Sequence, residues 1–149
     1  MNEILPNLYL SSYRAAQTYD GIHETFVVNC TKDLPMLSVK NIRVPVDDDC
    51  DRESIYNMLA AFPAVTDGIH TKLTASRPVV VHCQAGQQRS PTVVCAYMMR
   101  YAGYELHDAI RHIRSRRPEA FFWEVNFRYA LERYAEMIDL ANEQCVMKK

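Results

Sequence analysis

Hydrophobic stretches of two different periodicities alternate along the chain. Four short apolar or β-branched runs, bounded by turn-forming residues, have the length and composition of buried strands. They cover residues 8–10, 26–29, 42–46 and 79–82. Elsewhere, hydrophobic residues recur every three or four positions, which is typical of amphipathic helices. These helical patterns cover residues 55–69, 91–101, 106–113 and 127–138.

The order of these segments predicts the fold class. Strands that alternate with helices, followed by a helical C-terminal half, favour a mainly parallel sheet with helices packed on it. We therefore expect an α/β fold with a central, mainly parallel sheet of about five strands flanked by helices. Pro63 is expected to kink the first helix, and Pro118 to end the third. Because no repeat or Gly/Ser-rich linker divides the chain, residues 1–149 are expected to form one domain.

Composition and charge exclude several classes of protein. Hydrophobic residues make up 48% of the chain and charged residues 23%, which excludes a disordered protein. A net charge of -1 gives no general attraction for nucleic acid or anionic membrane, so we expect neither as a partner. The chain lacks an apolar run of membrane-spanning length and a signal-peptide pattern. We expect a monomer, without a spare N-terminal helix to exchange, that is cytoplasmic or nuclear rather than secreted.

The cysteines indicate free thiols. There are five of them, an odd number, and no two form a CxxC pair, so we expect neither a disulfide framework nor a zinc site. No other metal or cofactor is expected. A free thiol can act as a nucleophile, provided that its surroundings favour the thiolate.

One segment brings together groups that bind and attack phosphate. It reads HCQAGQQRSPT over residues 82–92 and joins a predicted strand to a predicted helix. The loop between Cys83 and Arg89 can direct its backbone N–H groups at one point, beside the positive end of the following helix. Gly86 permits the close backbone approach of such a loop, and the guanidinium of Arg89 can hold two phosphate oxygens. The predicted phosphate-binding residues are Gln84, Ala85, Gly86, Gln87, Gln88 and Arg89.

Cys83 lies at the predicted floor of this loop. The donors that bind phosphate also favour a thiolate, so a nucleophilic sulfur would face a bound phosphoryl group. The alternative is an inert buried cysteine beside a surface arginine. His82 before the cysteine, glycine three residues after it and Ser90 after the arginine together weigh against that alternative.

The segment resembles the signature of cysteine-based protein tyrosine phosphatases, specifically the small dual-specificity group. The resemblance covers roughly residues 3–140. It includes an opening strand over residues 4–12, residues 26–31, the Val44–Asp48 stretch, and Arg117-Pro118 followed by Asn126-Phe127.

This resemblance implies a phosphatase-like fold and a role for each residue of the motif. Cys83 would be the nucleophile, Arg89 the phosphate clamp, and Ser90 the hydroxyl that eases departure of the thiolate. His82 would orient Cys83 rather than act as a base. The chain departs from the pattern at Gln87 and Gln88, where the group often has an apolar residue and serine.

A leaving oxygen needs a proton, which a carboxylic acid can supply. Four aspartates follow the predicted strand at 42–46, namely Asp47, Asp48, Asp49 and Asp51. The spacing seen in the family assigns the acid role to Asp48, with Asp47 as the second choice. The other aspartates are expected to form a solvated turn that caps the next helix.

Two further features have two interpretations each. Arg111, Arg114, Arg116 and Arg117 are expected to form a solvated helix face, or else a docking surface for acidic peptides. Phe121-Phe122-Trp123 is costly to expose, so these rings either pack onto the core or line the rim of the site.

By resemblance, Cys30 is a candidate redox partner of Cys83. Each cysteine follows a predicted strand, and those strands are neighbours in the family's sheet. Related phosphatases carry a cysteine here that traps the oxidised nucleophile. The alternative is that Cys30 only fills space.

The expected activity is hydrolysis of phosphotyrosine, and of phosphoserine and phosphothreonine, through a cysteinyl-phosphate intermediate. Phosphorylated proteins are the expected partners. A phosphatase for RNA 5′ ends or phosphoinositides is one alternative, but such sites usually add Lys or Arg within the loop, whose intervening residues are uncharged here. A phosphopeptide-binding module is another, but that would lack Cys83 or Arg89.

Overall fold

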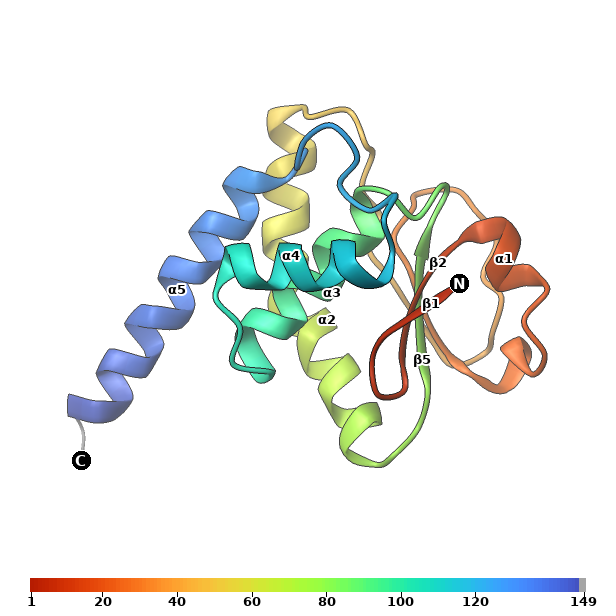
Figure 1. Ribbon diagram of the computed structural model, residues 1–149, viewed down its shortest axis with the longest axis horizontal. Coiled ribbons are helices and arrows are strands. Elements are labelled where there is room, and N and C mark those ends of the chain that lie inside the picture. The colour runs from red at the N-terminus through yellow and green to blue at the C-terminus, as the bar shows by residue number, and fades with distance from the viewer. Residues whose placement is uncertain (148–149) are drawn as a thin grey trace.

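The computed structural model describes residues 1–147 and is built around a five-stranded sheet (Figure 1). The strands lie side by side in the order β1-β2-β5-β3-β4. All neighbouring pairs are parallel except β1 and β2, which are antiparallel. The α/β class and the mainly parallel sheet are therefore confirmed. The strands are β1 (Asn2–Leu5), β2 (Leu8–Ser12), β3 (Phe26–Asn29), β4 (Asn41–Arg43) and β5 (Val79–Cys83).

Helices cover the two faces of the sheet unequally. Four long helices pack on one face, and the short helix α1 lies on the other (Figure 1). Alternate residues of β5 serve the two faces: Val79 and Val81 belong to the large core under the long helices, and Val80 to a smaller cluster with Ala16 of α1. The helices are α1 (Tyr13–Gln17), α2 (Arg52–Thr74), α3 (Arg89–Tyr101), α4 (Leu106–Arg116) and α5 (Arg128–Met147).

The N-terminal segment forms a hairpin rather than the single opening strand expected over residues 4–12. Pro6 and Asn7 make the turn between β1 and β2, and Leu5 pairs with Leu8. Asn7 adopts a φ of 68°, a left-handed conformation that asparagine tolerates better than most residues, and proline before it favours such a turn. The fifth strand of the sheet is therefore β1.

β4 is shorter than the strand expected over residues 42–46. It ends at Arg43, although Val44 and Val46 remain buried in the core. The N–H of Val44 still donates to the carbonyl of Asn29, at 2.8 Å. Pro45 has no N–H to donate, so the pairing cannot continue through it.

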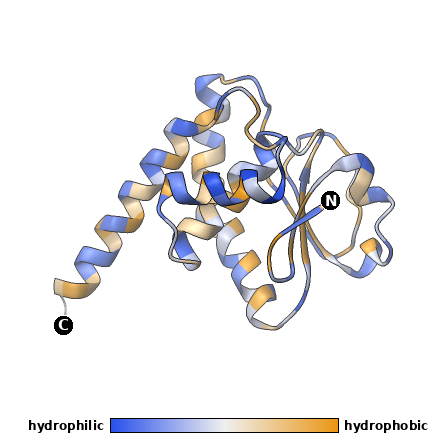
Figure 2. Cartoon of the chain, in the orientation of Figure 1, coloured by the Kyte–Doolittle hydropathy of each residue, from blue (hydrophilic) through white to orange (hydrophobic). Residues whose placement is uncertain are grey.

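The helical patterns of the sequence correspond to α2–α5, and α2 runs through Pro63 as one helix. α5 packs on the core through its first half, where Leu131 and Tyr134 are buried. Its last turns project away from the body with every side chain exposed (Figure 1), although several of them are hydrophobic (orange in Figure 2). No helix within residues 1–147 combines the length and hydropathy needed to cross a membrane.

The carboxyl ends of the parallel strands meet at one edge of the sheet, the upper edge in Figure 1. Three connections lie at this edge: the phosphate loop (residues 83–89), the aspartate loop (residues 47–51) and the α4–α5 connection (residues 117–127). Open α/β sheets usually place their ligand sites at this edge. All the predicted site residues are brought to it.

Candidate active site

Cys83 ends β5 at the floor of the phosphate loop. Its side chain is buried, and two hydrogen-bond donors contact the sulfur. The backbone N–H of Gly86 donates to Sγ at 3.3 Å, and the hydroxyl of Ser90 lies 3.1 Å from it. Both groups are able to donate a hydrogen bond to a sulfur at this position.

Gly86 is required by close packing behind the loop. It adopts a φ of 70°, and a Cβ there would lie 2.8 Å from the carbonyl of Ser11 and 2.7 Å from Nη2 of Arg117. Any side chain would therefore displace the loop from β2. The loop can bend tightly only because residue 86 has none.

Arg117 holds the loop from behind. Its guanidinium is almost fully buried and donates to the carbonyls of Gly86 at 2.9 Å and Ala85 at 3.1 Å, and to Oδ1 of Asn2 at 2.8 Å. By turning these two carbonyls toward the guanidinium, it helps to direct the loop's N–H groups to the opposite side. The expectation of a solvated basic face is therefore wrong for Arg117, although Arg111, Arg114 and Arg116 are exposed.

Arg89 begins α3 beside the phosphate loop. Its Nη1 donates to the carbonyl of Val46 at 3.0 Å, which ties the loop to the start of the aspartate loop. Its Nε is buried and contacts no acceptor within the described residues. A guanidinium in this position can offer its remaining N–H groups to an oxyanion.

His82 is completely buried under the loop. Its Nδ1 lies 3.2 Å from the carbonyl of Cys83, so Nδ1 carries the proton, because a carbonyl only accepts. Burial lowers the pKa of His82 from its usual value and keeps the ring neutral. A neutral ring that donates to this carbonyl suits an orienting role.

The four aspartates after β4 have different surroundings. Asp47 forms an ion pair with Lys32 at 2.8 Å. Asp51 caps α2, with its carboxylate accepting from the N–H of Glu53 at 2.8 Å. The hydroxyl of Ser54 lowers the pKa of Asp49 from its usual value.

Asp48 is exposed, as are Asp49 and Asp51, but its carboxylate reaches across to the α4–α5 connection. Its Oδ1 accepts from the side-chain amide of Asn126 at 2.9 Å. The contacts of Asp49 and Asp51 at the start of α2 agree with the prediction of a helix-capping turn. Within residues 1–147, the other carboxylate oxygen of Asp48 has no hydrogen-bond partner, and it lies at the edge of the sheet that holds the phosphate loop.

The three rings of the α4–α5 connection divide between core and surface. Phe121 is fully buried, and its N–H donates to the carbonyl of Gln87 at 2.7 Å. Phe122 is 53% exposed and Trp123 is 90% exposed, and the two rings meet edge to face. Core packing is therefore found for Phe121, whereas Phe122 and Trp123 are exposed, and their role at the rim of the site stays a prediction.

Cys30 directly follows β3, the strand beside β5. It is fully buried, and its N–H donates to the carbonyl of His82 at 2.8 Å. Burial raises the pKa of Cys30 well above its usual value, and the neighbouring Cys83 raises it further. All five cysteines lie within the described residues and are unpaired.

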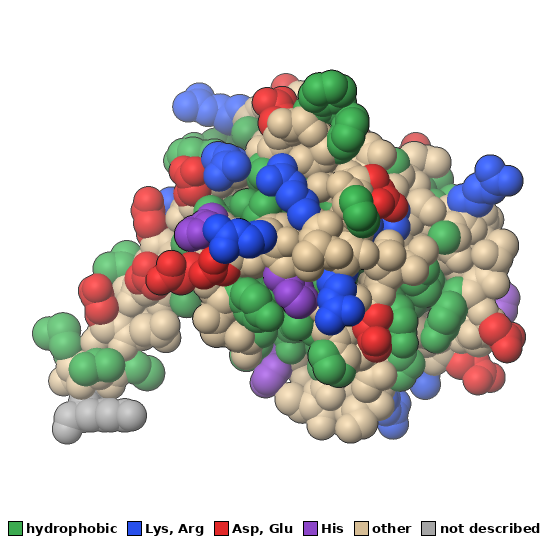
Figure 3. All heavy atoms as spheres, in the orientation of Figure 1, with side chains coloured by type: hydrophobic (Ala, Val, Ile, Leu, Met, Phe, Trp, Pro, Cys, Tyr) green, Lys and Arg blue, Asp and Glu red, His purple; other side chains and the backbone are tan. Residues whose placement is uncertain are grey.

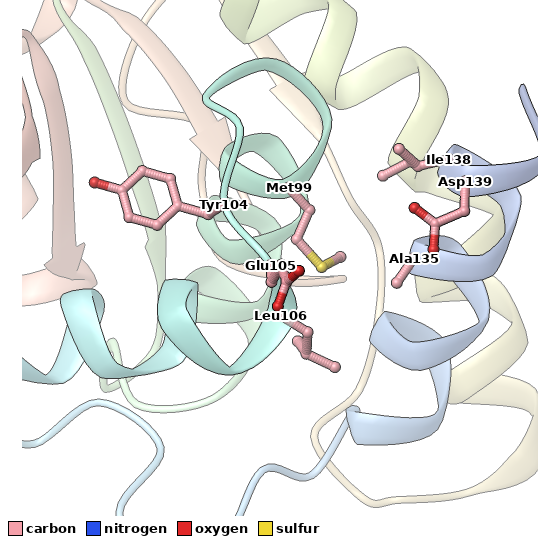
Figure 4. A pocket seen from close by; sticks show the side chains of 7 residues that line it. All are labelled: Met99, Tyr104, Glu105, Leu106, Ala135, Ile138 and Asp139. Carbon is pink, nitrogen blue, oxygen red and sulfur yellow. The ribbon is translucent and has the colours of Figure 1, made fainter. Parts of the chain in front are cut away.

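A hollow lies away from the phosphate loop, where the α3–α4 turn meets α5 (Figure 4). It has a volume of about 230 Å³ and contains no cysteine, histidine or arginine. On the face of the molecule shown in Figure 3, Lys and Arg side chains (blue) lie over and around the region of α4. The residues predicted as nucleophile, clamp and acid, Cys83, Arg89 and Asp48, lie on loops that meet at the sheet edge.

The site combines a buried cysteine at the end of a central parallel strand, a loop that ends in an arginine, and a helix that begins beside this loop. The sequence matches the family described as dual specificity phosphatase, catalytic domain, over residues 8–137. The chain therefore belongs to this family, and it is a phosphatase that removes phosphate from tyrosine and from serine or threonine in proteins.

Individual relatives agree with this assignment. Human dual specificity phosphatase 28 is 30% identical over 145 residues, which cover 91% of this chain and 77% of the relative. The crystal structure of human DUSP28 superimposes with a TM-score of 0.83 and 28% identity, covering 95% of this chain and 99% of that one. Human dual specificity protein phosphatase 9 is 33% identical over 115 residues, which cover 72% of this chain but only 29% of that longer protein.

Proposed function

We propose that Cys83, Arg89, Ser90 and Asp48 hydrolyse phosphate monoesters through a cysteinyl-phosphate intermediate. This proposal rests on two hydrogen-bond contacts of the Cys83 sulfur, with the N–H of Gly86 at 3.3 Å and with the hydroxyl of Ser90 at 3.1 Å. They stabilise a thiolate at the floor of a loop that can bind an oxyanion.

The sulfur attacks phosphorus while the bond to the leaving oxygen breaks, and Asp48 gives that oxygen a proton. The N–H groups of residues 84–89 and the guanidinium of Arg89 hold the three other oxygens. Water then attacks the cysteinyl phosphate and passes a proton to Asp48, while Ser90 donates to the departing thiolate. His82 keeps the carbonyl of Cys83 in place throughout.

A panel of substrates tests the proposed specificity. Phosphotyrosine and phosphothreonine peptides, a phosphoinositide and an RNA 5′-triphosphate are compared by phosphate release. We expect turnover of the peptides, because Gln84, Ala85 and Gln87 add no positive charge for a second phosphate. Faster turnover of the phosphoinositide or RNA would contradict the proposal, and binding of peptides without turnover would indicate a phosphopeptide-binding module.

The proposal also includes the setting in which the chain works. We infer a single catalytic domain over residues 1–149 that acts as a cytoplasmic or nuclear monomer, without nucleic acid or membrane as a partner. Five unpaired cysteines support a reducing compartment. A net charge of -1 supports the absence of nucleic acid and membrane partners.

Trp123 is expected to contact the substrate peptide at the rim of the site. Trp123→Ala should raise KM for a phosphotyrosine peptide by about 2- to 10-fold, because one aromatic contact contributes about 0.5–1.5 kcal/mol. KM for a small aryl phosphate should not change. Because Trp123 is 90% exposed, its thermal unfolding should match wild type.

Phe121 provides the matched comparison for this test. Phe121→Ala removes a fully buried ring and should lower the free energy of unfolding by about 3–5 kcal/mol. A large loss of stability in Trp123→Ala, with KM for the peptide unchanged, would contradict a rim role.

Cys30 is expected to trap oxidised Cys83. Peroxide converts the thiolate of Cys83 to a sulfenic acid, and attack by the thiol of Cys30 then forms a disulfide and releases water. Neighbouring strands lie about 4.8 Å apart, within the range of about 4.4–6.8 Å between Cα atoms that a disulfide accepts. Peptide mapping after mild peroxide should find a Cys30–Cys83 bond.

Recovery with dithiothreitol provides the second measurement. Wild type should regain activity, whereas Cys30→Ser should regain less, because its Cys83 can be oxidised further. Equal recovery of the two proteins would mean that Cys30 serves only packing.

A further inference from the structure

The side chain of Gln88 points away from the phosphate-binding side of its loop. It is 7% exposed, and both ends of its amide bind the α4–α5 connection. Nε2 donates to the carbonyl of Glu124 at 2.8 Å and, more weakly, to that of Phe122 at 3.4 Å. Oε1 accepts from the backbone N–H of Asn126 at 3.0 Å. The amide is therefore fully used within the protein, and only the backbone of residue 88 is available to phosphate.

Gln88 is itself anchored by the helix that follows it. Its carbonyl accepts from both the N–H of Thr92 at 3.0 Å and the hydroxyl of Thr92 at 2.7 Å. The side chain thus extends from a fixed backbone position into the connection. Position 88 needs a side chain with a donor and an acceptor at the end of a two-carbon stem, which glutamine has. Serine is too short to reach the connection. Glutamate would place a negative charge against carbonyl oxygens.

The held segment carries the residue that contacts the acid candidate. The N–H of Asn126 is bound by Gln88, and the side-chain amide of Asn126 donates to Oδ1 of Asp48 at 2.9 Å. Because this amide nitrogen only donates, Oδ1 must accept. When Asp48 is protonated, its proton therefore belongs on Oδ2.

We propose that Gln88 is a positioning residue for proton transfer: it fixes Asn126, and Asn126 fixes the carboxyl of Asp48 with Oδ2 as the proton donor. The inference rests on the proposed function, in which Asp48 is the acid. It adds a physical link from the phosphate loop to the aspartate loop through the α4–α5 connection. The side-chain amides of Gln88 and Asn126 thus connect the loop that binds phosphate to the carboxyl group that donates the proton.

The test compares two substrates by kcat/KM, which reports on transfer of phosphate to cysteine. Gln88→Met keeps the length of the side chain but removes its donors and acceptor. We expect a loss of about 10-fold with a phosphotyrosine peptide, part of the roughly 10²–10⁴-fold effect of a general acid. With p-nitrophenyl phosphate, whose leaving group needs little protonation, the loss should stay below about 3-fold. The inhibition constant of inorganic phosphate should not change.

Further variants separate positioning from structural damage. Asn126→Ala breaks the last contact and should show the same dependence on the leaving group. The double variant Gln88→Met/Asp48→Asn should be no slower than Asp48→Asn alone, because both changes affect one proton transfer. Gln144→Met, an exposed change on the projecting end of α5, should match wild type on both substrates.

Three results would overturn the inference: equal losses on the two substrates in both variants, additive losses in the double variant, or weaker inhibition by phosphate in Gln88→Met. The last would make Gln88 a phosphate ligand. Failure of the wild-type protein to hydrolyse either substrate would instead contradict the proposed function.

Discussion

Replacing Cys83 by serine is expected to reduce turnover to less than about 1% of wild type while leaving anion binding intact. A serine hydroxyl at this position holds its proton, and no neighbouring base is placed to remove it, because His82 directs its Nδ1 proton at a carbonyl. The donors that bind the anion do not depend on the sulfur. Arg89 and the loop N–H groups should hold phosphate or tungstate as in wild type, which calorimetry can measure.

Cys145→Ser is the matched control for this experiment. The residue is an exposed cysteine on the projecting end of α5, and its replacement should leave turnover unchanged. Residual turnover above about 1% in Cys83→Ser would mean that the nucleophile is another group. Loss of anion binding together with turnover would mean that the loop had collapsed, and that the sulfur supports its structure.

Asp48→Asn is expected to lower kcat/KM by about 10²–10³-fold for a phosphotyrosine peptide. The amide cannot give a proton to the leaving oxygen, although it retains an oxygen that can accept from Asn126. The loss should be much smaller for p-nitrophenyl phosphate, whose leaving group needs little protonation. Steady-state rates on the two substrates measure this difference.

Two neighbouring aspartates make this prediction specific. Asp51→Asn should stay close to wild type, because asparagine caps a helix about as well as aspartate. An equal loss on both substrates in Asp48→Asn would remove the acid role from that residue. Asp47 would then be the next candidate, despite its ion pair with Lys32.

The features that could be predicted from the sequence are those set by neighbouring residues. The run before Cys83 is apolar on both faces of its strand, so a central strand follows from local composition. The phosphate loop follows from the spacing between Cys83 and Arg89, because five residues join a strand end to a helix start. The sequence also contains Pro45, which ends the pairing of β4, but the hydrophobic residues on both sides of it, Val44 and Val46, make the strand pattern look longer than β4 is.

The features that could not be predicted depend on contacts between distant residues. Arg117 lies in a run of arginines, and it differs from its exposed neighbours by its burial and by its hydrogen bonds to residues 2, 85 and 86. Gln88 and Asn126 are 38 positions apart. No periodicity relates such positions, since their contact exists only after three separate connections have been brought to the same edge of the sheet.

The bond between Arg117 and Asn2 has a practical consequence for handling the protein. Because Nη1 of the arginine donates to Oδ1 of Asn2 at 2.8 Å, the first residues form part of the support behind the phosphate loop. An affinity tag fused before Met1 would be separated from Asn2, and so from its contact with Arg117, by a single residue. A tag after α5 would start from a helix end that projects away from the site (Figure 1). Kinetic work on this enzyme should therefore use C-terminal fusions, or N-terminal ones that are cleaved before assay.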